Sequence, residues 1–180
     1  GILYKNSDTL EQDHKITAVV LDKTGTITKG ELAVTDIVAS SQASLSGDEL
    51  LRLAASAEQG SEHPLGEAIV RQAGELGLSL SVPAAFQAMA GFGIAADVDG
   101  RKVLLGNRRL MQQEQVTLNG LEPKAEQLQN EAKTAMWLSV DGQANALIAV
   151  ADTIKDDSAG AIEEMHRLGL TVAMLTGDNA

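Results

Sequence analysis

Short apolar runs stand near the two ends of the chain. Residues 16–21 form a β-rich run, Ile-Thr-Ala-Val-Val-Leu, and residues 170–175 form another. The first run is typical of a strand buried in a parallel sheet, and the second predicts a closing apolar strand. Residues 156–168 carry acidic side chains early and His166 and Arg167 late, as a helix dipole favours. The ends of the chain therefore predict an α/β domain with parallel strands.

Between the ends, apolar and polar residues alternate with a period of two, which is typical of half-buried strands. The predicted strands are residues 82–89, 92–98, 101–105, 134–140 and 144–150, with a further candidate at 33–39. Asp-Gly pairs at 99–100 and 141–142 predict hairpins, because both turn positions tolerate positive φ. We therefore expect an antiparallel sheet in the middle of the chain.

Helical segments separate and follow these strands. Ser46, with Glu49 three residues later, has the spacing of a capping box and opens the first helix. Pro64 suits the first turn of a second helix, because its missing N–H would be unpaired there in any case. Residues 107–115 and 121–130 are predicted as two more helices.

The simplest architecture is a middle domain inserted into a split outer domain. We expect the outer α/β domain at residues 1–34 and 147–180, and the inserted α+β domain at residues 35–146. The inserted domain should be an antiparallel sheet flanked by helices, while the outer domain should carry the parallel strands.

Composition narrows the classes of partner. The chain has 180 residues and a formal net charge of −11, which repels phosphate backbones and anionic lipid, so we expect no nucleic acid partner. Its aromatic residues are too few for a stacking platform, namely Tyr4, Phe86, Phe92 and Trp137. The absence of cysteine rules out a disulfide framework and a thiolate metal site. No apolar run approaches the about 18 residues that cross a bilayer.

Asp22 is the first candidate for chemistry. It follows the strand at 16–21 directly, and Gly25 then turns the chain, which places a carboxylate at the ligand edge of an open α/β sheet. An aspartate in this position can attack a phosphorus atom. Amides of the turn, Mg²⁺ and the charge of Lys23 would stabilise the transferring phosphoryl group.

Two threonine residues affect the chemistry that we expect at Asp22. Thr176, with Asp178 beyond it, follows the strand at 170–175, so its hydroxyl can bind the same phosphoryl oxygens if the two strands are neighbours. Thr24 stands two residues after Asp22, where simple aspartate-based phosphatases have a second aspartate as general acid and base. Without that group water is activated poorly, so an aspartyl phosphate should persist.

Six segments of the chain, in the order of the family, resemble signatures of P-type ATPases of the heavy-metal-transporting branch. They are residues 22–28 (Asp-Lys-Thr-Gly-Thr-Ile-Thr), 61–65 (Ser-Glu-His-Pro-Leu), 91–94 (Gly-Phe-Gly-Ile), 106–107 (Gly-Asn), 152–155 (Asp-Thr-Ile-Lys) and 176–179 (Thr-Gly-Asp-Asn). The combination is highly specific and spans essentially all of the chain. Within the branch it is most similar to copper exporters.

The resemblance implies a split, truncated phosphorylation domain of the haloacid dehalogenase-like (HAD-like), Rossmann-type fold, with an inserted nucleotide-binding domain. Asp22 would take the phosphate from ATP. Mg²⁺ would bind at Asp22 and Thr24. The residues implied in catalysis are Asp22, Lys23, Thr24, Thr176, Gly177 and Asp178.

The resemblance also implies a nucleotide site in the inserted domain. The residues implied are Glu62, His63, Gly91, Gly93, Ile94, Gly106 and Asn107. Glu62 and His63 would meet the adenine end of ATP. Gly91 and Gly93 would let the backbone approach the nucleotide without a Cβ in the way.

The resemblance further implies that the chain is a piece of a larger pump, a cytoplasmic domain of an integral protein of the cell membrane. Its partners would be ATP and the actuator and transmembrane domains of the same protein. The exported ion, with Cu⁺ favoured, would bind outside this segment. The family pattern continues past Asn179 with a magnesium-binding aspartate and a lysine. We therefore expect the isolated segment to bind nucleotide with little or no turnover.

Plainer interpretations of single residues stay open. His63 before a proline also suits a capping residue, Asn107 also suits a helix cap, and Asp152 with Lys155 suits an ordinary surface ion pair. For the whole chain, two alternatives remain. One is a soluble HAD-type phosphatase, against which Thr24 argues, and the other is a non-catalytic nucleotide-binding module.

Overall fold

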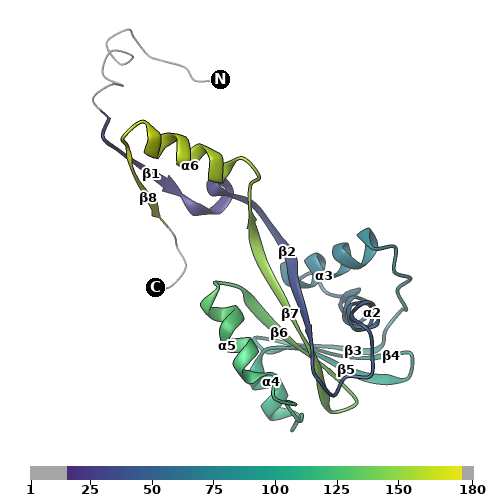
Figure 1. Ribbon diagram of the computed structural model, residues 1–180. Coiled ribbons are helices and arrows are strands. Elements are labelled where there is room, and N and C mark those ends of the chain that lie inside the picture. Colours follow the sequence, from purple (N-terminus) through teal and green to yellow (C-terminus); the bar gives the residue numbers. More distant parts are fainter. Residues whose placement is uncertain (1–15, 176–180) are drawn as a thin grey trace. The chain divides into compact units, whose positions relative to one another are not determined.

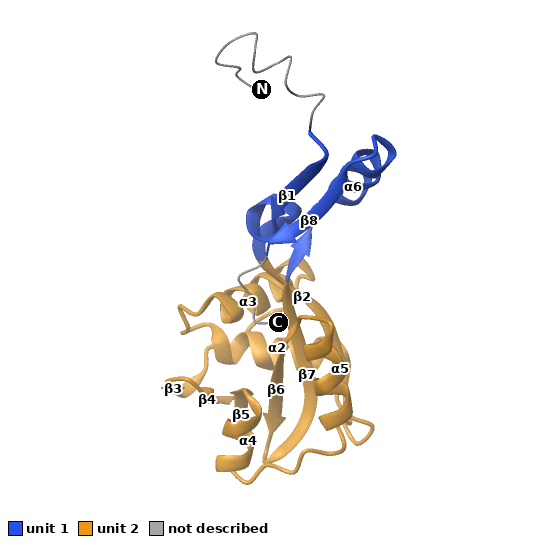
Figure 2. Cartoon of the chain, turned by 90° about the vertical axis from the view of Figure 1, so that its left-hand side faces the viewer, with its two compact units in different colours: residues 1–31, 152–180 blue, residues 32–151 orange. Residues whose placement is uncertain are grey.

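The computed structural model describes residues 16–175, and the chain divides into two compact units. Unit 1 comprises residues 1–31 and 152–180, and unit 2 comprises residues 32–151 (Figure 2). The sequence places the domain boundaries at 34/35 and 146/147, three to five residues away from this division. No helix among residues 16–175 is long and apolar enough to cross a membrane.

Unit 1 is built on a parallel pair of strands. β1 (Ala18–Asp22) pairs with β8 (Thr171–Leu175), so that Asp22 lies opposite Leu175. The turn η2 (Lys23–Ile27) follows β1, and helix α6 (Ser158–Arg167) precedes β8 and packs against it (Figure 1). The parallel α/β arrangement predicted from the two apolar runs is confirmed.

The prediction that the first of these strands, at residues 16–21, is buried is wrong for the described part of the unit, and the second strand is open to solvent as well. Val20 is 66% exposed and Met174 is 57% exposed. In residues 16–31 and 152–175 the sheet has two strands, and α6 packs against β8. One helix cannot cover both faces of a sheet, so apolar side chains of the pair stay open to solvent.

Unit 2 contains a sheet of six strands in the order β2-β7-β6-β5-β4-β3 (Figure 1). The strands are β2 (Thr28–Ala39), β3 (Ala84–Met89), β4 (Gly93–Val98), β5 (Arg101–Gly106), β6 (Thr134–Val140) and β7 (Gln143–Ile154). Neighbours from β3 to β7 are antiparallel, as the sequence predicts. β2 begins earlier and β7 ends later than expected, and both strands contribute residues to each unit.

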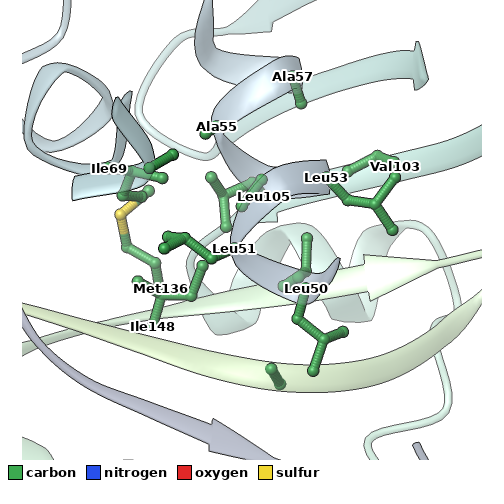
Figure 3. Close-up of a cluster of buried hydrophobic side chains, with 14 of the residues drawn as sticks. Leu50, Leu51, Leu53, Ala55, Ala57, Ile69, Val103, Leu105, Met136 and Ile148 are labelled. Atoms are coloured by element: carbon green, nitrogen blue, oxygen red, sulfur yellow. The ribbon is translucent and has the colours of Figure 1, made fainter. Parts of the chain in front are cut away.

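Two pairs of helices cover the two faces of this sheet. α2 (Gly47–Glu58) and α3 (Pro64–Glu75) share a buried cluster with Val103 and Leu105 of β5. α4 (Arg108–Gln113) and α5 (Glu122–Asn130) share a second buried cluster with Leu104, which lies between Val103 and Leu105 along β5. Alternate residues of a strand point to opposite faces, which is why the period of two in the sequence yields two cores. Figure 3 shows the first core, where leucines of α2 meet side chains of the sheet.

Local signals at the ends of these elements are confirmed. Ser46 caps α2, and the reciprocal bonds of a capping box with Glu49 are both present. Asp99 and Gly100 both have positive φ, at 51° and 76°, in the hairpin between β4 and β5. The 141–142 pair turns β6 into β7 in the same way.

Candidate functional site

Unit 2 contains a cavity of about 410 Å³. Its walls come from the end of α2, the start of α3, strands β3 to β6 and the turn before β4. Six of the residues predicted at a nucleotide site line it: His63, Gly91, Gly93, Ile94, Gly106 and Asn107. Glu62, predicted with them, is exposed and does not line the cavity.

The walls of the cavity are mostly apolar, with few polar groups. The larger apolar side chains are Leu65, Met89, Phe92, Ile94 and Met136. The polar ones are Glu58, Ser61, His63, Asn107 and Thr134. A concave, largely apolar cavity with a few polar groups among its lining residues is typical of a small-molecule site and suits a flat ring with a polar edge.

His63 is the N-cap of α3. Its Nδ1 accepts a hydrogen bond from the Leu65 amide at 3.2 Å, and its own amide donates to Ser61 Oγ at 3.3 Å. In a neutral imidazole whose Nδ1 is an acceptor, the proton resides on Nε2. The interpretation of His63 as a helix cap is therefore confirmed. The same hydrogen bond orients the ring beside the cavity and leaves Nε2–H as a donor.

Asn107 caps a helix and braces a turn at the same time. Its Oδ1 accepts from the Leu110 amide at 3.0 Å as the N-cap of α4. Its Nδ2 donates to the Gly91 carbonyl at 2.8 Å, and its backbone amide donates to the Phe92 carbonyl at 2.8 Å. Asn107 thereby fixes the turn at 90–92, which lines the cavity.

Gly93 and Gly106 lie opposite each other in the pairing of β4 with β5. A Cβ at Gly93 would meet the Leu105 carbonyl oxygen at 2.2 Å, and one at Gly106 would meet the Phe92 carbonyl oxygen at 2.2 Å. The backbones of the two strands are therefore too close for side chains. Close packing of the two strands therefore requires glycine at these positions.

Glu58 is a lining residue that the sequence reasoning missed. It is the last residue of α2, it is 4% exposed, and its Oε2 has no hydrogen-bond partner within the described structure. Burial raises the pKa of this carboxyl group, against smaller opposing effects of Ser61 and His63. The sequence did contain a signal for this burial. Glu58 follows the buried Leu51 by seven residues and the buried Ala54 by four, which places it on the apolar face of α2. A buried acceptor without a partner can bind an N–H group of a ligand.

The candidate phosphorylation loop lies in unit 1. Asp22 ends β1 and is exposed, and the exposed residues Thr24 and Gly25 follow it in the turn, with Gly25 at φ 75°. Lys155 Nζ donates to the Gly25 carbonyl at 2.7 Å. The Gly25 amide donates to Thr28 Oγ1 at 3.2 Å, so this amide of the turn is engaged within the protein.

The carboxylate of Asp152 contacts the end of the same loop, and it does so instead of forming the predicted ion pair with Lys155. Its Oδ2 accepts a hydrogen bond from the Thr28 hydroxyl at 2.6 Å, and its Oδ1 accepts one from the Gly30 amide at 3.0 Å. The backbone amide of Lys155 and the hydroxyl of Ser158 both donate to the Ile27 carbonyl. The segment 152–158 therefore holds the loop after Asp22 in place, which is a more specific role than a surface ion pair.

Other predicted residues fall outside these observations. Thr176, Gly177 and Asp178 lie beyond the described residues. Lys23 is partly buried. Within residues 16–175, no three histidine or acidic side chains gather into a group that could hold a metal ion. Asp22 offers an exposed carboxylate, which together with phosphate oxygens and water is the hard oxygen chemistry that Mg²⁺ prefers.

Comparison with known proteins gives a consistent picture. A family model described as haloacid dehalogenase-like hydrolase matches residues 16–180. The chain is 46% identical over 179 residues to a copper-exporting P-type ATPase of Bacillus subtilis, which covers 99% of this chain and 22% of that protein. It is 48% identical over 182 residues to a probable copper-exporting P-type ATPase of Archaeoglobus fulgidus, with the same coverage. The chain thus spans about a fifth of the length of these relatives.

Solved structures agree with these relatives. A zinc-transporting PIB-type ATPase in its E2.Pi state matches with a TM-score of 0.87 and 36% identity, over 98% of this chain and 28% of that chain. The N-domain of HMA6, a copper-transporting P-type ATPase, matches with a TM-score of 0.56 and 25% identity, over 67% of this chain and 99% of that domain.

Proposed function

The chain belongs to the haloacid dehalogenase-like hydrolase family, and on that premise we propose that it is the ATP-binding and phosphorylation region of a copper-exporting P-type ATPase. The observation that carries the proposal is the cavity of unit 2, whose lining residues include six from the nucleotide signatures. Its mostly apolar walls and few polar groups match a purine base. Similarity to copper-exporting relatives over 99% of the chain supports the choice of pump.

In this proposal the cavity binds the adenine end of ATP. The exocyclic amine of adenine donates to Glu58, whose buried carboxylate has an oxygen without a hydrogen-bond partner in the described part of the chain. The Nε2–H of His63 donates to a ring nitrogen, since the cap of α3 keeps its Nδ1 engaged. Phe92 and Met136 contribute apolar contact with the ring. The brace from Asn107 keeps the turn at 90–92 in the shape that admits the nucleotide.

Asp22 is the acceptor of the phosphoryl group. A carboxylate oxygen of Asp22 attacks the γ-phosphorus of ATP, the new P–O bond forms an acyl phosphate, and the bond to the bridging oxygen breaks to release ADP. Transfer requires the γ-phosphate of ATP bound in unit 2 to reach Asp22. The contacts from Asp152 and Lys155 keep the loop after Asp22 ordered for this step. Mg²⁺ bound by Asp22 and Thr24 would neutralise charge on the phosphates.

Thr24 separates this function from that of a simple phosphatase. Thr24 is two residues after Asp22 and has no carboxyl group to activate water. The aspartyl phosphate therefore lasts long enough to drive a conformational cycle. In the whole protein that cycle would involve actuator and transmembrane domains in a cell membrane, with Cu⁺ as the transported ion and this region on the cytoplasmic side.

A titration of the 180-residue chain with ATP and GTP tests the nucleotide site. We expect ATP to bind more tightly than GTP, because the oxygen at C6 of guanine is an acceptor that Glu58 would repel. His63→Asn keeps a capping side chain on α3 but removes the Nε2 donor, so it should weaken ATP binding about tenfold without loss of stability. His63→Ala should weaken ATP binding and lower the free energy of unfolding by about 1 kcal/mol.

The exposed His166 of α6, in unit 1, provides the matched control, and His166→Asn should leave ATP affinity unchanged. If His63→Asn binds ATP as tightly as the unaltered chain, His63 acts only as a helix cap and its assignment to the base is wrong. If the unaltered chain does not bind ATP at all, the proposed function fails. For the whole pump, acid-stable label from γ-labelled ATP should disappear in Asp22→Asn.

A further inference from the structure

Gly66 lies in the first turn of α3, directly beside the buried carboxyl group of Glu58. A Cβ built on Gly66 would stand 2.4 Å from Glu58 Oε2, 2.8 Å from Glu58 Cδ and 3.3 Å from Ser61 Oγ. The first two distances are far below van der Waals contact, so no side chain fits at this position while Glu58 keeps its place. Gly66 is itself buried.

The backbone conformation at position 66 does not require a glycine. Its φ is not positive, since it is absent from the positive-φ glycines of the described chain, and it lies within a regular helix. Alanine is a better helix former than glycine by about 1 kcal/mol at an interior position. The glycine therefore costs helix stability, and the contact with Glu58 is the feature of the structure that accounts for it.

The place of Glu58 links this contact to the cavity. Glu58 ends α2 and lines the cavity, and its Oε2 is buried without a hydrogen-bond partner among residues 16–175. The first turn of α3 forms the wall on one side of the carboxyl group. A methyl group at position 66 would push the flexible end of Glu58 away from that wall, and the geometry of its open acceptor would change.

We propose that Gly66 is a positioning residue, which leaves room for the Glu58 carboxyl group and thereby sets the preference of the cavity for a purine with an amine rather than an oxygen at C6. This inference rests on the proposed nucleotide site. Gly66 makes no contact with the nucleotide in this account. It acts through Glu58, so its effect depends on the presence of that side chain.

A double-mutant cycle on the 180-residue chain tests the inference. Gly66→Ala should weaken ATP binding about tenfold and reduce the ratio of ATP to GTP affinity. In a Glu58→Ala background, the same substitution should change neither quantity, because the side chain that it displaces is gone. Gly74→Ala is the matched control on the same helix, because a Cβ at Gly74 would meet no described atom within 4 Å beyond its chain neighbours and the adjacent backbone of α3, and ATP and GTP affinities should stay unchanged.

The pH profile of ATP binding adds a readout that general distortion of α3 would not move. Glu58 and His63 are the ionisable side chains that line the cavity in the described structure. Displacement of Glu58 toward water should shift the carboxyl-dependent part of the profile to lower pH in Gly66→Ala. Gly74→Ala should keep the profile of the unaltered chain.

Three results would overturn the inference. The first is that Gly66→Ala binds ATP and GTP with the same affinities as the unaltered chain. The second is that Gly66→Ala loses affinity for ATP and for GTP by the same factor. The third is that Gly66→Ala still weakens ATP binding in the Glu58→Ala background. If Gly66→Ala does not fold, thermal unfolding of Glu58→Ala/Gly66→Ala decides. Recovery of the fold supports the contact with Glu58, and failure to recover contradicts it. Absence of ATP binding to the unaltered chain would instead defeat the proposed function.

Discussion

Glu58 has surroundings that favour the neutral form of its carboxyl group. It is 4% exposed, and burial raises its pKa. A folded-state pKa above the unfolded value means that the folded chain holds the proton more tightly. The ionised carboxyl therefore lowers stability, and this cost appears as pH rises from the unfolded value through the raised folded value.

Glu58→Gln should consequently raise the free energy of unfolding at pH 7 while it weakens ATP binding. The stability difference from the unaltered chain should shrink as the pH falls from the raised folded-state pKa of Glu58 toward its unfolded-state value, below which the carboxyl is neutral in both states. Urea unfolding of both chains at several pH values between 4 and 8 measures this difference in the free energy of unfolding. Glu126→Gln, on the exposed side of α5, serves as the control and should show no such trend.

A lower stability of Glu58→Gln at pH 7 would contradict the interpretation of Glu58 as a costly buried charge. A gain in stability with a loss of ATP affinity would fit a residue retained for binding at the expense of the fold. His63 differs from Glu58, because its Nδ1 stabilises the fold as the cap of α3, while its Nε2 is the atom proposed to bind the base.

At the scale of elements, the pairing of β4 with β5 depends on Gly93 and Gly106. The Cβ of any other residue at Gly93 would meet backbone atoms of β5, which cannot move like the end of a side chain. The same close approach forms one wall of the cavity. Strand packing and cavity shape therefore depend on the same two residues.

Gly93→Ala should destabilise unit 2 by about 3 kcal/mol through this overlap and through the φ of 143° at Gly93. Thermal unfolding measures the change, and Gly47→Ala provides the control, because a Cβ at Gly47 has no atom within 4 Å. Equal stability of Gly93→Ala and the unaltered chain would show that β4 and β5 are not packed as described.

The loop after Asp22 depends on one distant carboxylate. Asp152 accepts hydrogen bonds from Thr28, 124 residues away in sequence, and from the Gly30 amide. Asp152→Ala should therefore raise the hydrogen-exchange rate of the Gly30 amide at least tenfold, as expected for the loss of a bond to a charged acceptor worth about 1.5 kcal/mol. Asp157→Ala is the control, since Asp157 precedes α6 without a capping bond from its side chain. Unchanged exchange at Gly30 would contradict the anchoring role of Asp152.

Elements with local signals could be predicted from the sequence. The capping box at Ser46, the hairpin at 99–100 and the strand before Asp22 each depend on residues a few positions apart. Contacts between distant segments could not. The burial of Glu58 depends on the approach of α3, and the need for Gly93 depends on the register of β5. Periodicity predicts which face is apolar but does not predict which side chains meet there.

At the scale of the whole molecule, all the lining residues of the cavity belong to unit 2, and Asp22 belongs to unit 1. Unit 2 also contains both hydrophobic clusters and the whole of helices α2 to α5. A unit with its own core should fold alone. Nucleotide binding and phosphorylation are therefore expected to be separable.

Residues 32–151 expressed alone should fold and bind ATP with the affinity of the whole chain within about twofold, because no lining residue is removed. Circular dichroism and calorimetric titration measure the two properties. A folded unit 2 that binds ATP more than tenfold more weakly would show that unit 1 contributes to the nucleotide site.

The central claim is that ATP binds in the cavity of unit 2 through its adenine end. Amide chemical shifts of the ¹⁵N-labelled chain, recorded while ATP is added, test it most directly. We expect saturable changes concentrated at Glu58, His63, Gly91, Gly93 and Asn107, which are reproduced by adenosine at higher concentration. Changes confined to the loop at 22–28, or no saturable change in the cavity residues, would contradict it.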